Sequence, residues 1–427
     1  MTQSDENSAG ERFKLTAIRL PVAWTFGGLI GGLLLGMVLA DAGLAEQLKQ
    51  SIALIGSLWL RALQMTIIPL VAALLVLGIA QMAEAARAGA AARKFLMLVF
   101  GVLIAGGLFA SFAMPAVLQL FPIPESASAF LADVPDNAGE VPDIFAFLAS
   151  LIAPNVIAAA AETAMLPLTI FFALFAVAVS RLPADQSERM LGFFHALANT
   201  MLMIIGWVLW IAPIGVFALA FGVGLKSGGG AFAALAHYIL VVSAMGAFIL
   251  VLAYVIGMVM GRIGPMRFAK ALVPAQAVAV STQSSLASLP AMLDSAGRLG
   301  IRQETSEFVL PLAVAIFRAT SVAMNMAVAL YVAALAGIEV PLALMLVGIL
   351  VAVIISIGSV SLPGSISFVV SIGPIALAMG IPIEPLALLV AVEMMPDIMR
   401  TLANVTMNVA VTSAVDRGGV DAHPAET

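Results

Sequence analysis

Long apolar stretches alternate with short polar connections along most of the chain. As helices, these stretches are long enough to cross a hydrocarbon core of about 30 Å at about 1.5 Å per residue. They cover residues 20–40, 52–82, 95–121, 144–180, 190–222 and 237–261. The first stretch follows polar residues 1–19 and has no small-residue cleavage site before a polar segment, so we expect a retained helix.

After residue 265 the apolar pieces become shorter and are interrupted by Pro, Gly and Ser. The interruptions lie at residues 274–292, 311, 356–364 and 382–396. Paired broken segments indicate re-entrant hairpins, which are tolerated at membrane depth only where protein or a cavity surrounds them. The pattern predicts an all-α integral membrane protein with eight transmembrane helices plus two re-entrant helical hairpins.

Composition narrows the class of protein. Apolar residues make up 62% and charged residues 10% of the 427 residues, whereas a soluble domain has about 25% charged residues. The net charge of −5 without a basic run excludes nucleic-acid binding. The absence of cysteine and of a Gly-Lys pair, with only three scattered histidines, excludes disulfides, a Walker A loop and a zinc site. We expect no cofactor.

Positive charges predict the orientation. If the N-terminus is cytoplasmic, both termini and four connections fall inside and hold 14 of the 19 Lys and Arg residues; the connections are 84–94, 181–189, 262–270 and 298–302. The outside loops hold only Lys49 and Lys226. This asymmetry follows the positive-inside rule. We expect a multi-pass protein of the bacterial inner membrane with both termini in the cytoplasm.

Three arginines lie inside apolar stretches: Arg61, Arg318 and Arg400. A charge at membrane depth costs roughly 3 kcal/mol on insertion scales, so such a residue indicates function. Arg61 lies near a helix end, where its side chain can instead snorkel to the interface. Arg318 and Arg400 lie deeper and are candidates for substrate binding.

A polar stripe marks the last helix. Glu393, Asp397, Arg400, Asn404 and Asn408 fall within an arc of roughly 80° at about 100° per residue. The stripe is either an ion-pair seam between helices or a ligand site. In a ligand site the Arg400 fork binds a carboxylate and Asp397 accepts from an ammonium group, which together describe an amino acid. A second carboxylate would make it an acidic one.

These residues resemble the glutamate/aspartate transporter family, also called the dicarboxylate/amino acid:cation symporters. The family's last-helix motif D-x-x-R-T-x-x-N-V-T is matched by Asp397-Ile-Met-Arg400-Thr401-Leu-Ala-Asn404-Val-Thr. Its two hairpin tips are matched by Ser284-Ser285-Leu-Ala-Ser-Leu-Pro290 and by residues 356–364, and its second and fifth helices by residues 60–70 and 212–219. The match runs in order from about residue 20 to 415.

The resemblance implies a homotrimer in membrane lipid, with inverted repeats and an elevator mechanism. The scaffold is residues 20–82 and 144–222, the moving transport domain is residues 94–121 and 237–415, and residues 1–19 and 416–427 are cytoplasmic tails. It implies that a small anionic substrate is bound by Ser284, Ser285, Arg318, Ser321, Ser359, Pro363, Gly364, Asp397, Arg400, Thr401 and Asn404. Glycines 27, 28, 31, 32 and 36 allow close packing within one protomer or between subunits.

The chain departs from the family at its sodium sites. In the ungapped register from Pro290 and Pro311 to Ser356, the family's N-M-D-G-T falls on residues 317–321 and not on the letter match at Asn325. The sodium-binding aspartates then become Ala319 and Asn408, and residues 94–108 contain no hydroxyl.

Hard cations need oxygen ligands and negative charge. We therefore expect no metal site, with the Arg318 guanidinium acting as a tethered cation in place of sodium. A wrong register for this helix would leave a conventional sodium symporter.

Without sodium, transport is proton-coupled or uncoupled. Glu393 is the candidate proton carrier, because burial and the like charge of Asp397 one turn away favour its neutral form. The alternative is a simple ion pair between Glu393 and an arginine. Only one glycine stands in the tip at 359–364, which predicts a stiff gate closed by substrate alone. A conventional gate with serines in place of glycines is the alternative.

Other classes fit less well. A channel needs polar groups along its length, but here they gather at one depth. A hydrolase needs a His or Lys partner for Ser284 or Ser356 at membrane depth, which the sequence lacks, so we expect no enzyme activity. A C4-dicarboxylate is the second substrate class. Asp397 would repel it, unless Arg318 pairs with Asp397 and leaves Arg400 free.

Overall fold

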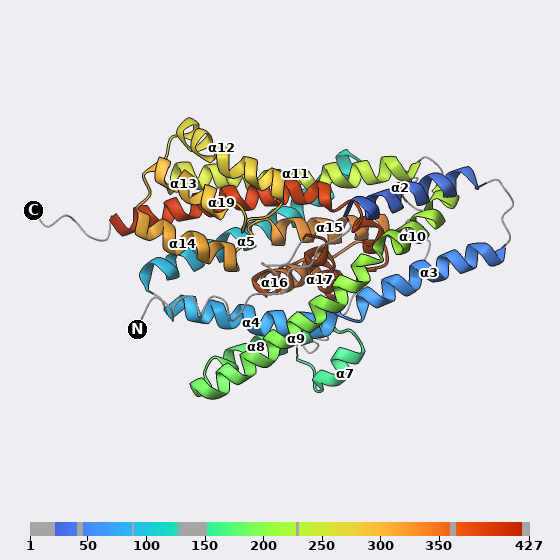
Figure 1. The fold of residues 1–427 in the computed structure, drawn as a ribbon, viewed down its shortest axis with the longest axis horizontal. Helices are drawn as coiled ribbons and strands as arrows, with labels where there is room; N and C mark the ends of the chain where they lie inside the picture. The colour runs from blue at the N-terminus through green and yellow to red at the C-terminus, as the bar shows by residue number, and fades with distance from the viewer. Residues whose placement is uncertain are drawn as a thin grey trace, which may run out of the picture.

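The protein is helical throughout the part of the chain that is placed. A computed structural model describes residues 22–40, 46–87, 89–125, 127, 152–227, 230–358 and 364–420, and all its regular elements in these ranges are helices (Figure 1). This confirms the all-α prediction. The tip residues 359–363, including the candidate site residues Ser359 and Pro363, lie outside the described residues.

The first half of the chain forms nine helices in the described ranges. They are α2 (Val22–Val38), α3 (Glu46–Gln64), α4 (Ile67–Arg87), α5 (Ala90–Leu120), α7 (Val156–Ala161), α8 (Met165–Val179), α9 (Ala184–Trp210), α10 (Ala212–Ser227) and α11 (Gly230–Val259). Three predicted apolar stretches are divided, between α3 and α4, between α7 and α8, and between α9 and α10. Pro69 and Pro213 stand in the first turns of α4 and α10, where the missing N–H is tolerated.

The second half contains two helix pairs. Helix α12 (Pro265–Thr282) packs against α13 (Leu289–Leu299), and α16 (Leu342–Gly358) packs against α17 (Gly364–Ala378). Between the pairs lie α14 (Gln303–Ile316) and α15 (Ser321–Leu335), and after them α18 (Leu386–Leu389) and α19 (Met394–Val420). The pairs coincide with the predicted hairpins, and their depth in a membrane remains a prediction.

Several helical stretches are long and apolar enough to span a membrane. In the described ranges these are Lys49–Glu84, Ala90–Leu120, Ala184–Trp210, Gly230–Val259 and Gln303–Leu335. Shorter apolar helices cover Ala23–Val38, Met165–Val179, Ala212–Leu225 and Leu342–Ile357. A multi-pass membrane protein is therefore confirmed in outline, while the count of eight crossings stays a prediction.

The helices pack in two groups. In the first, α2 and α3 pack against α10, and α4 packs against α8 and α9. In the second, α19 packs against α11, α12 and α14, while α5 packs against α15. The pair α16 and α17 touches α4 and α8 and so joins the groups. The division of the chain into a scaffold and a moving transport domain stays a prediction.

The turns α4–α5, α8–α9 and α13–α14 lie at the same end of the molecule as the end of α19 (Figure 1). These are connections that the positive charges assign to the cytoplasm, so the helix directions agree with the predicted threading. Arg61 is exposed in the last turn of α3, where its side chain is free to snorkel.

Glycines of α2 make close contacts within the chain. A Cβ on Gly28, Gly32 or Gly36 would overlap the backbone carbonyl oxygen of Pro213, Phe217 or Phe221, respectively, in α10. Gly27 instead faces open space in the monomer. Three of the five α2 glycines therefore pack inside one protomer, which was the first of the two alternatives.

Candidate functional site

A break between α14 and α15 forms one side of the candidate site. Helix α14 ends at Ile316, Phe317 is extended with φ −129° and ψ 113°, and α15 begins at Ser321. This is where the ungapped register places the family's unwound motif, whereas Asn325 lies inside α15. The backbone N–H and the hydroxyl of Thr320 donate to Asn404 Oδ1 at 2.9 and 3.1 Å. The buried amide of Asn404 thus accepts hydrogen bonds from Thr320 at the break, where the backbone lacks regular helical partners.

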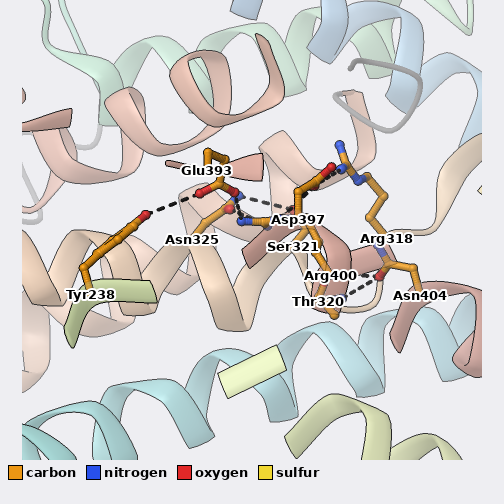
Figure 2. A network of polar contacts seen from close by, with 9 residues as sticks. All are labelled: Tyr238, Arg318, Thr320, Ser321, Asn325, Glu393, Asp397, Arg400 and Asn404. Atoms are coloured by element: carbon orange, nitrogen blue, oxygen red, sulfur yellow. Dashed lines mark hydrogen bonds and ion pairs between the residues drawn. The ribbon is translucent and has the colours of Figure 1, made fainter. Parts of the chain in front are cut away.

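The start of α19 forms the other side. Glu393 lies one residue before α19, so the helix begins slightly later than the predicted polar stripe. The backbone N–H of Asp397 nevertheless donates to the Glu393 carbonyl at 2.9 Å, which keeps helical spacing between the two residues. Figure 2 shows the side chains of Glu393, Asp397 and Arg400 lying near Asn325 of α15.

Arg400 is held by three acceptors. Its Nη2 lies 2.8 Å from Glu393 Oε1, its Nη1 donates to Asn325 Oδ1 at 3.0 Å, and its Nε lies 3.5 Å from Asp397 Oδ1. The residue is only 4% exposed. A guanidinium offers five N–H donors, and here the fork that would bind a substrate carboxylate is engaged by the protein itself.

Asp397 lies between two guanidinium groups. Arg318 reaches it from the break between α14 and α15, with Nη2 3.9 Å from Asp397 Oδ1. The same oxygen is the one that faces Arg400 Nε. The pairing of Arg318 with Asp397 is confirmed, but the idea that this pairing leaves Arg400 free is wrong, because Arg400 is bound to Glu393 and Asn325.

The second oxygen of Glu393 is also engaged. The hydroxyl of Tyr238, from α11, donates to Glu393 Oε2 at 3.3 Å (Figure 2). Glu393, Asp397 and Arg400 are buried, and the Arg318 side chain is only 11% exposed. Two arginines and two acids make the cluster formally neutral, which is the balance that charges removed from water require.

The remaining candidate residues take different places. Ser321 begins α15, and its hydroxyl accepts from Asn325 Nδ2 at 3.4 Å, while Thr401 is buried on α19. Ser284 and Ser285 are half-buried in the turn between α12 and α13, where Ser284 Oγ accepts from the Ala287 N–H. Gly364 is the first residue of α17. The structure therefore joins Arg318, Ser321, Glu393, Asp397, Arg400 and Asn404 in one network.

The two residues that the expected register aligns with the family's sodium-binding aspartates are buried and uncharged. Ala319 and Asn408 are both 0% exposed, and the amide oxygen and nitrogen of Asn408 have no hydrogen-bond partner among the described residues. The described ranges contain no group of three or more His, Asp or Glu side chains placed to hold a metal. The side chains at these two positions offer a hard cation one amide oxygen and no carboxylate.

Sequence reasoning missed Thr320 at the helix break and two residues of the network that lie on helices, Tyr238 and Asn325. Both contribute polar atoms from long apolar helices, and a buried polar group almost always has a partner. The presence of these polar residues in apolar helices therefore indicated that each makes a polar contact, but it did not indicate with which residue. Asn325 was considered only as part of a rejected motif.

Comparison with known proteins agrees with this architecture. A sequence profile described as the Sodium:dicarboxylate symporter family matches residues 22–418. The chain is 27% identical to the Proton/glutamate-aspartate symporter of Escherichia coli (strain K12), with 83% of this chain and 82% of the relative covered. It is 26% identical to the Proton/sodium-glutamate symport protein of Geobacillus stearothermophilus over 91% and 92%, and 26% identical to the C4-dicarboxylate transport protein of Laribacter hongkongensis over 91% and 87%.

Proposed function

Because the chain belongs to the sodium:dicarboxylate symporter family, we propose that it is a secondary transporter of acidic amino acids such as aspartate and glutamate. It resides in the bacterial inner membrane and works without sodium, either coupled to protons or uncoupled. The names of two similar proteins, a proton/glutamate-aspartate symporter and a proton/sodium-glutamate symport protein, support the substrate class and a role for protons.

The observation that carries the proposal is the contact of 2.8 Å between Arg400 Nη2 and Glu393 Oε1. A proton on Glu393 removes the negative charge that holds this part of the guanidinium. The Arg400 fork can then bind a substrate carboxylate in a bidentate manner. Protonation also changes the cluster from neutral to a net charge of +1, which matches an acidic amino acid carrying −1.

Arg318 takes the role of the sodium ion that the altered positions no longer hold. Its guanidinium extends from the broken helix to Asp397 and supplies a fixed positive charge where Ala319 and Asn408 replace the expected carboxylates. A covalently attached cation needs no binding from solution, so transport proceeds without sodium. The alternative to this part of the proposal is a conventional sodium symporter.

The transport cycle is an elevator movement. The cluster is built from α11, α15, α19 and the break before α15, which all belong to the second packing group. We expect α5 and α11–α19 to slide with the substrate along α2–α4 and α7–α10, and we expect three protomers to surround a common axis in the membrane. The tip at residues 359–364 closes over the substrate without sodium.

The decisive experiment is substrate uptake into proteoliposomes containing the purified protein. Sodium is replaced by choline, and an inward proton gradient is either imposed or absent. Retained uptake in choline with stimulation by the gradient supports a proton-coupled transporter. A loss of uptake by orders of magnitude in choline contradicts the proposal and favours a sodium symporter.

A C4-dicarboxylate is the second candidate substrate. The contact between Arg318 and Asp397 favours it, because it neutralises the carboxylate that would otherwise repel a second acidic group. A relative named as a C4-dicarboxylate transport protein gives the same indication. Competition of labelled aspartate uptake by succinate and by aspartate distinguishes the two substrate classes.

A further inference from the structure

His237 of α11 contacts α15 and the residue after α5. These contacts lie away from the end of the molecule that holds the turn α13–α14 (Figure 1). The histidine lies in the second turn of α11 and is half-buried. Its Nε2 is 2.9 Å from the carbonyl oxygen of Phe121, directly after α5, and its Nδ1 is 3.1 Å from the hydroxyl of Tyr331 on α15. Because a carbonyl only accepts, Nε2 carries a hydrogen, and in the neutral ring Nδ1 accepts from Tyr331.

The hydroxyl of Tyr331 has a second acceptor. The backbone oxygen of Ala234 lies 3.4 Å from it. When His237 takes up a proton, its Nδ1–H can donate to the Tyr331 oxygen while the Tyr331 hydroxyl turns to Ala234. Both protonation states of His237 are thus satisfied by hydrogen bonds with little rearrangement, which is what a residue that repeatedly binds and releases a proton needs.

A second tyrosine continues from Tyr331 toward the cluster. The rings of Tyr238 and Tyr331 meet edge to face, with centroids 5.3 Å apart and an interplanar angle of 76°. The Tyr238 hydroxyl points to Glu393 (Figure 2) and donates to its Oε2. Contacts therefore connect the half-buried His237 to the buried Glu393 through Tyr331 and Tyr238, by hydrogen bonds at both ends and by ring packing between the two tyrosines.

We propose that His237, Tyr331 and Tyr238 are the path by which a proton from the outer side reaches Glu393. The inference rests on the proton-coupled form of the proposed function. A proton first adds to His237 Nδ1. It passes to the Tyr331 oxygen as Tyr331 gives its own proton to the Tyr238 oxygen, and Tyr238 gives its proton to Glu393 Oε2. The histidine returns to neutral, each tyrosine keeps one proton, and Glu393 becomes the neutral acid.

The transfer between the two tyrosines is the step joined by ring contact instead of a direct hydrogen bond. It requires a ring to reorient, so we expect it to be the slowest step of the path. At the two ends of the path, polar and charged groups surround the residues that take up the proton. The path ends at a carboxylate that faces Tyr238 from α11 and Arg400 and Asp397 from α19, with Arg318 at the helix break beyond Asp397. At the entrance, the ring nitrogens of His237 face only the Phe121 carbonyl and the Tyr331 hydroxyl among the described residues.

The path is tested by uptake into proteoliposomes with the inside pH fixed and the outside pH varied. The variants are His237→Gln, Tyr331→Phe and Tyr238→Phe, each of which keeps the size of its side chain. The matched control is His195→Gln, because His195 is the other described histidine and its ring lies beside Asn199 on α9, a helix that contributes no residue to the path. Substrate affinity at equilibrium is measured on the same proteins.

A positioned proton donor contributes roughly 10²- to 10⁴-fold to a transfer step. Since domain movement shares control of the rate, we expect acid-stimulated uptake to fall at least about tenfold in the three path variants. Equilibrium affinity and its pH dependence should stay unchanged in His237→Gln and Tyr331→Phe, and His195→Gln should behave as the wild type. Tyr238→Phe also removes a hydrogen bond to Glu393 Oε2, so only its acid-stimulated rate is compared with the other two variants. A merely structural role would instead change affinity and stability together.

The two proposals fail in different ways. If the wild type shows no proton stimulation, proton coupling itself is wrong. If the wild type is stimulated, Glu393→Gln is not, and all three path variants keep the wild-type rate, then Glu393 carries the proton but receives it by another route. That second result overturns the path alone.

Discussion

Arg400 and Glu393 are seven residues apart in sequence and lie in direct contact, with Nη2 of the arginine 2.8 Å from Oε1 of the glutamate. The arginine is the donor best suited to a substrate carboxylate, and the glutamate occupies it. Two functions that the sequence presented as alternatives, an ion pair and a proton site, are therefore compatible in one contact. The ion pair can act as the resting state that a proton opens.

We predict that Glu393→Gln makes uptake independent of the proton gradient while substrate binding persists. Glutamine keeps one oxygen acceptor where the glutamate offers one oxygen to Arg400 and the other to Tyr238, and it carries no charge, so the variant mimics the protonated state. Substrate affinity should no longer fall as the pH rises, because no proton has to bind before Arg400 is released. Binding and uptake are measured across a range of pH.

The control for this variant is Asp294→Asn. Asp294 forms an exposed pair with Arg298 at 2.8 Å, and exposed pairs contribute little to stability. This change should leave the pH dependence as in the wild type. A Glu393→Gln protein that still responds to the gradient would remove Glu393 from the mechanism.

A second prediction concerns Asn325, which accepts from Arg400 Nη1 at 3.0 Å. Asn325→Leu leaves that buried donor without its partner, and an unsatisfied buried polar group costs about 1–3 kcal/mol. We expect a lower midpoint of thermal unfolding. Asn325→Gln keeps an amide oxygen acceptor without adding a buried charge and should remain closer to the wild type in stability. An Asn325→Leu protein as stable as the wild type would show that the contact is not maintained.

The sequence predicted those features that depend on local pattern. Apolar length predicted helices, Pro290 and Pro311 set the register that placed the break at residues 317–320, and helical spacing placed Asp397 and Arg400 on one face. The sequence pattern did not predict contacts between residues that are distant in the chain. Tyr238 meets Glu393, and Asn325 meets Arg400, only because α11 and α15 pack beside α19, and no local pattern encodes which helices become neighbours.

A third prediction tests the packing of α2 on α10. In Gly32→Ala the new methyl group would overlap the Phe217 carbonyl oxygen, and such overpacking costs about 1–3 kcal/mol. Gly27→Ala is the matched control on the same helix, since its methyl group enters open space and alanine favours a helix over glycine by about 1 kcal/mol. Thermal unfolding in detergent should separate the two. Equal destabilisation would place Gly27 in a contact between subunits.

The last prediction concerns Arg318 and the absence of a sodium requirement. Arg318→Met keeps an unbranched, flexible side chain but removes the charge beside Asp397. Losing one partner of a buried charge pair costs about 2 kcal/mol or more, so we expect substrate affinity to fall at least about thirtyfold. Wild-type binding should be equal in sodium and in choline. The double variant Arg318→Met with Ala319→Asp restores a carboxylate and removes the tethered cation, so sodium should increase its affinity for substrate. If sodium increases the affinity of the wild type instead, Arg318 does not replace the ion.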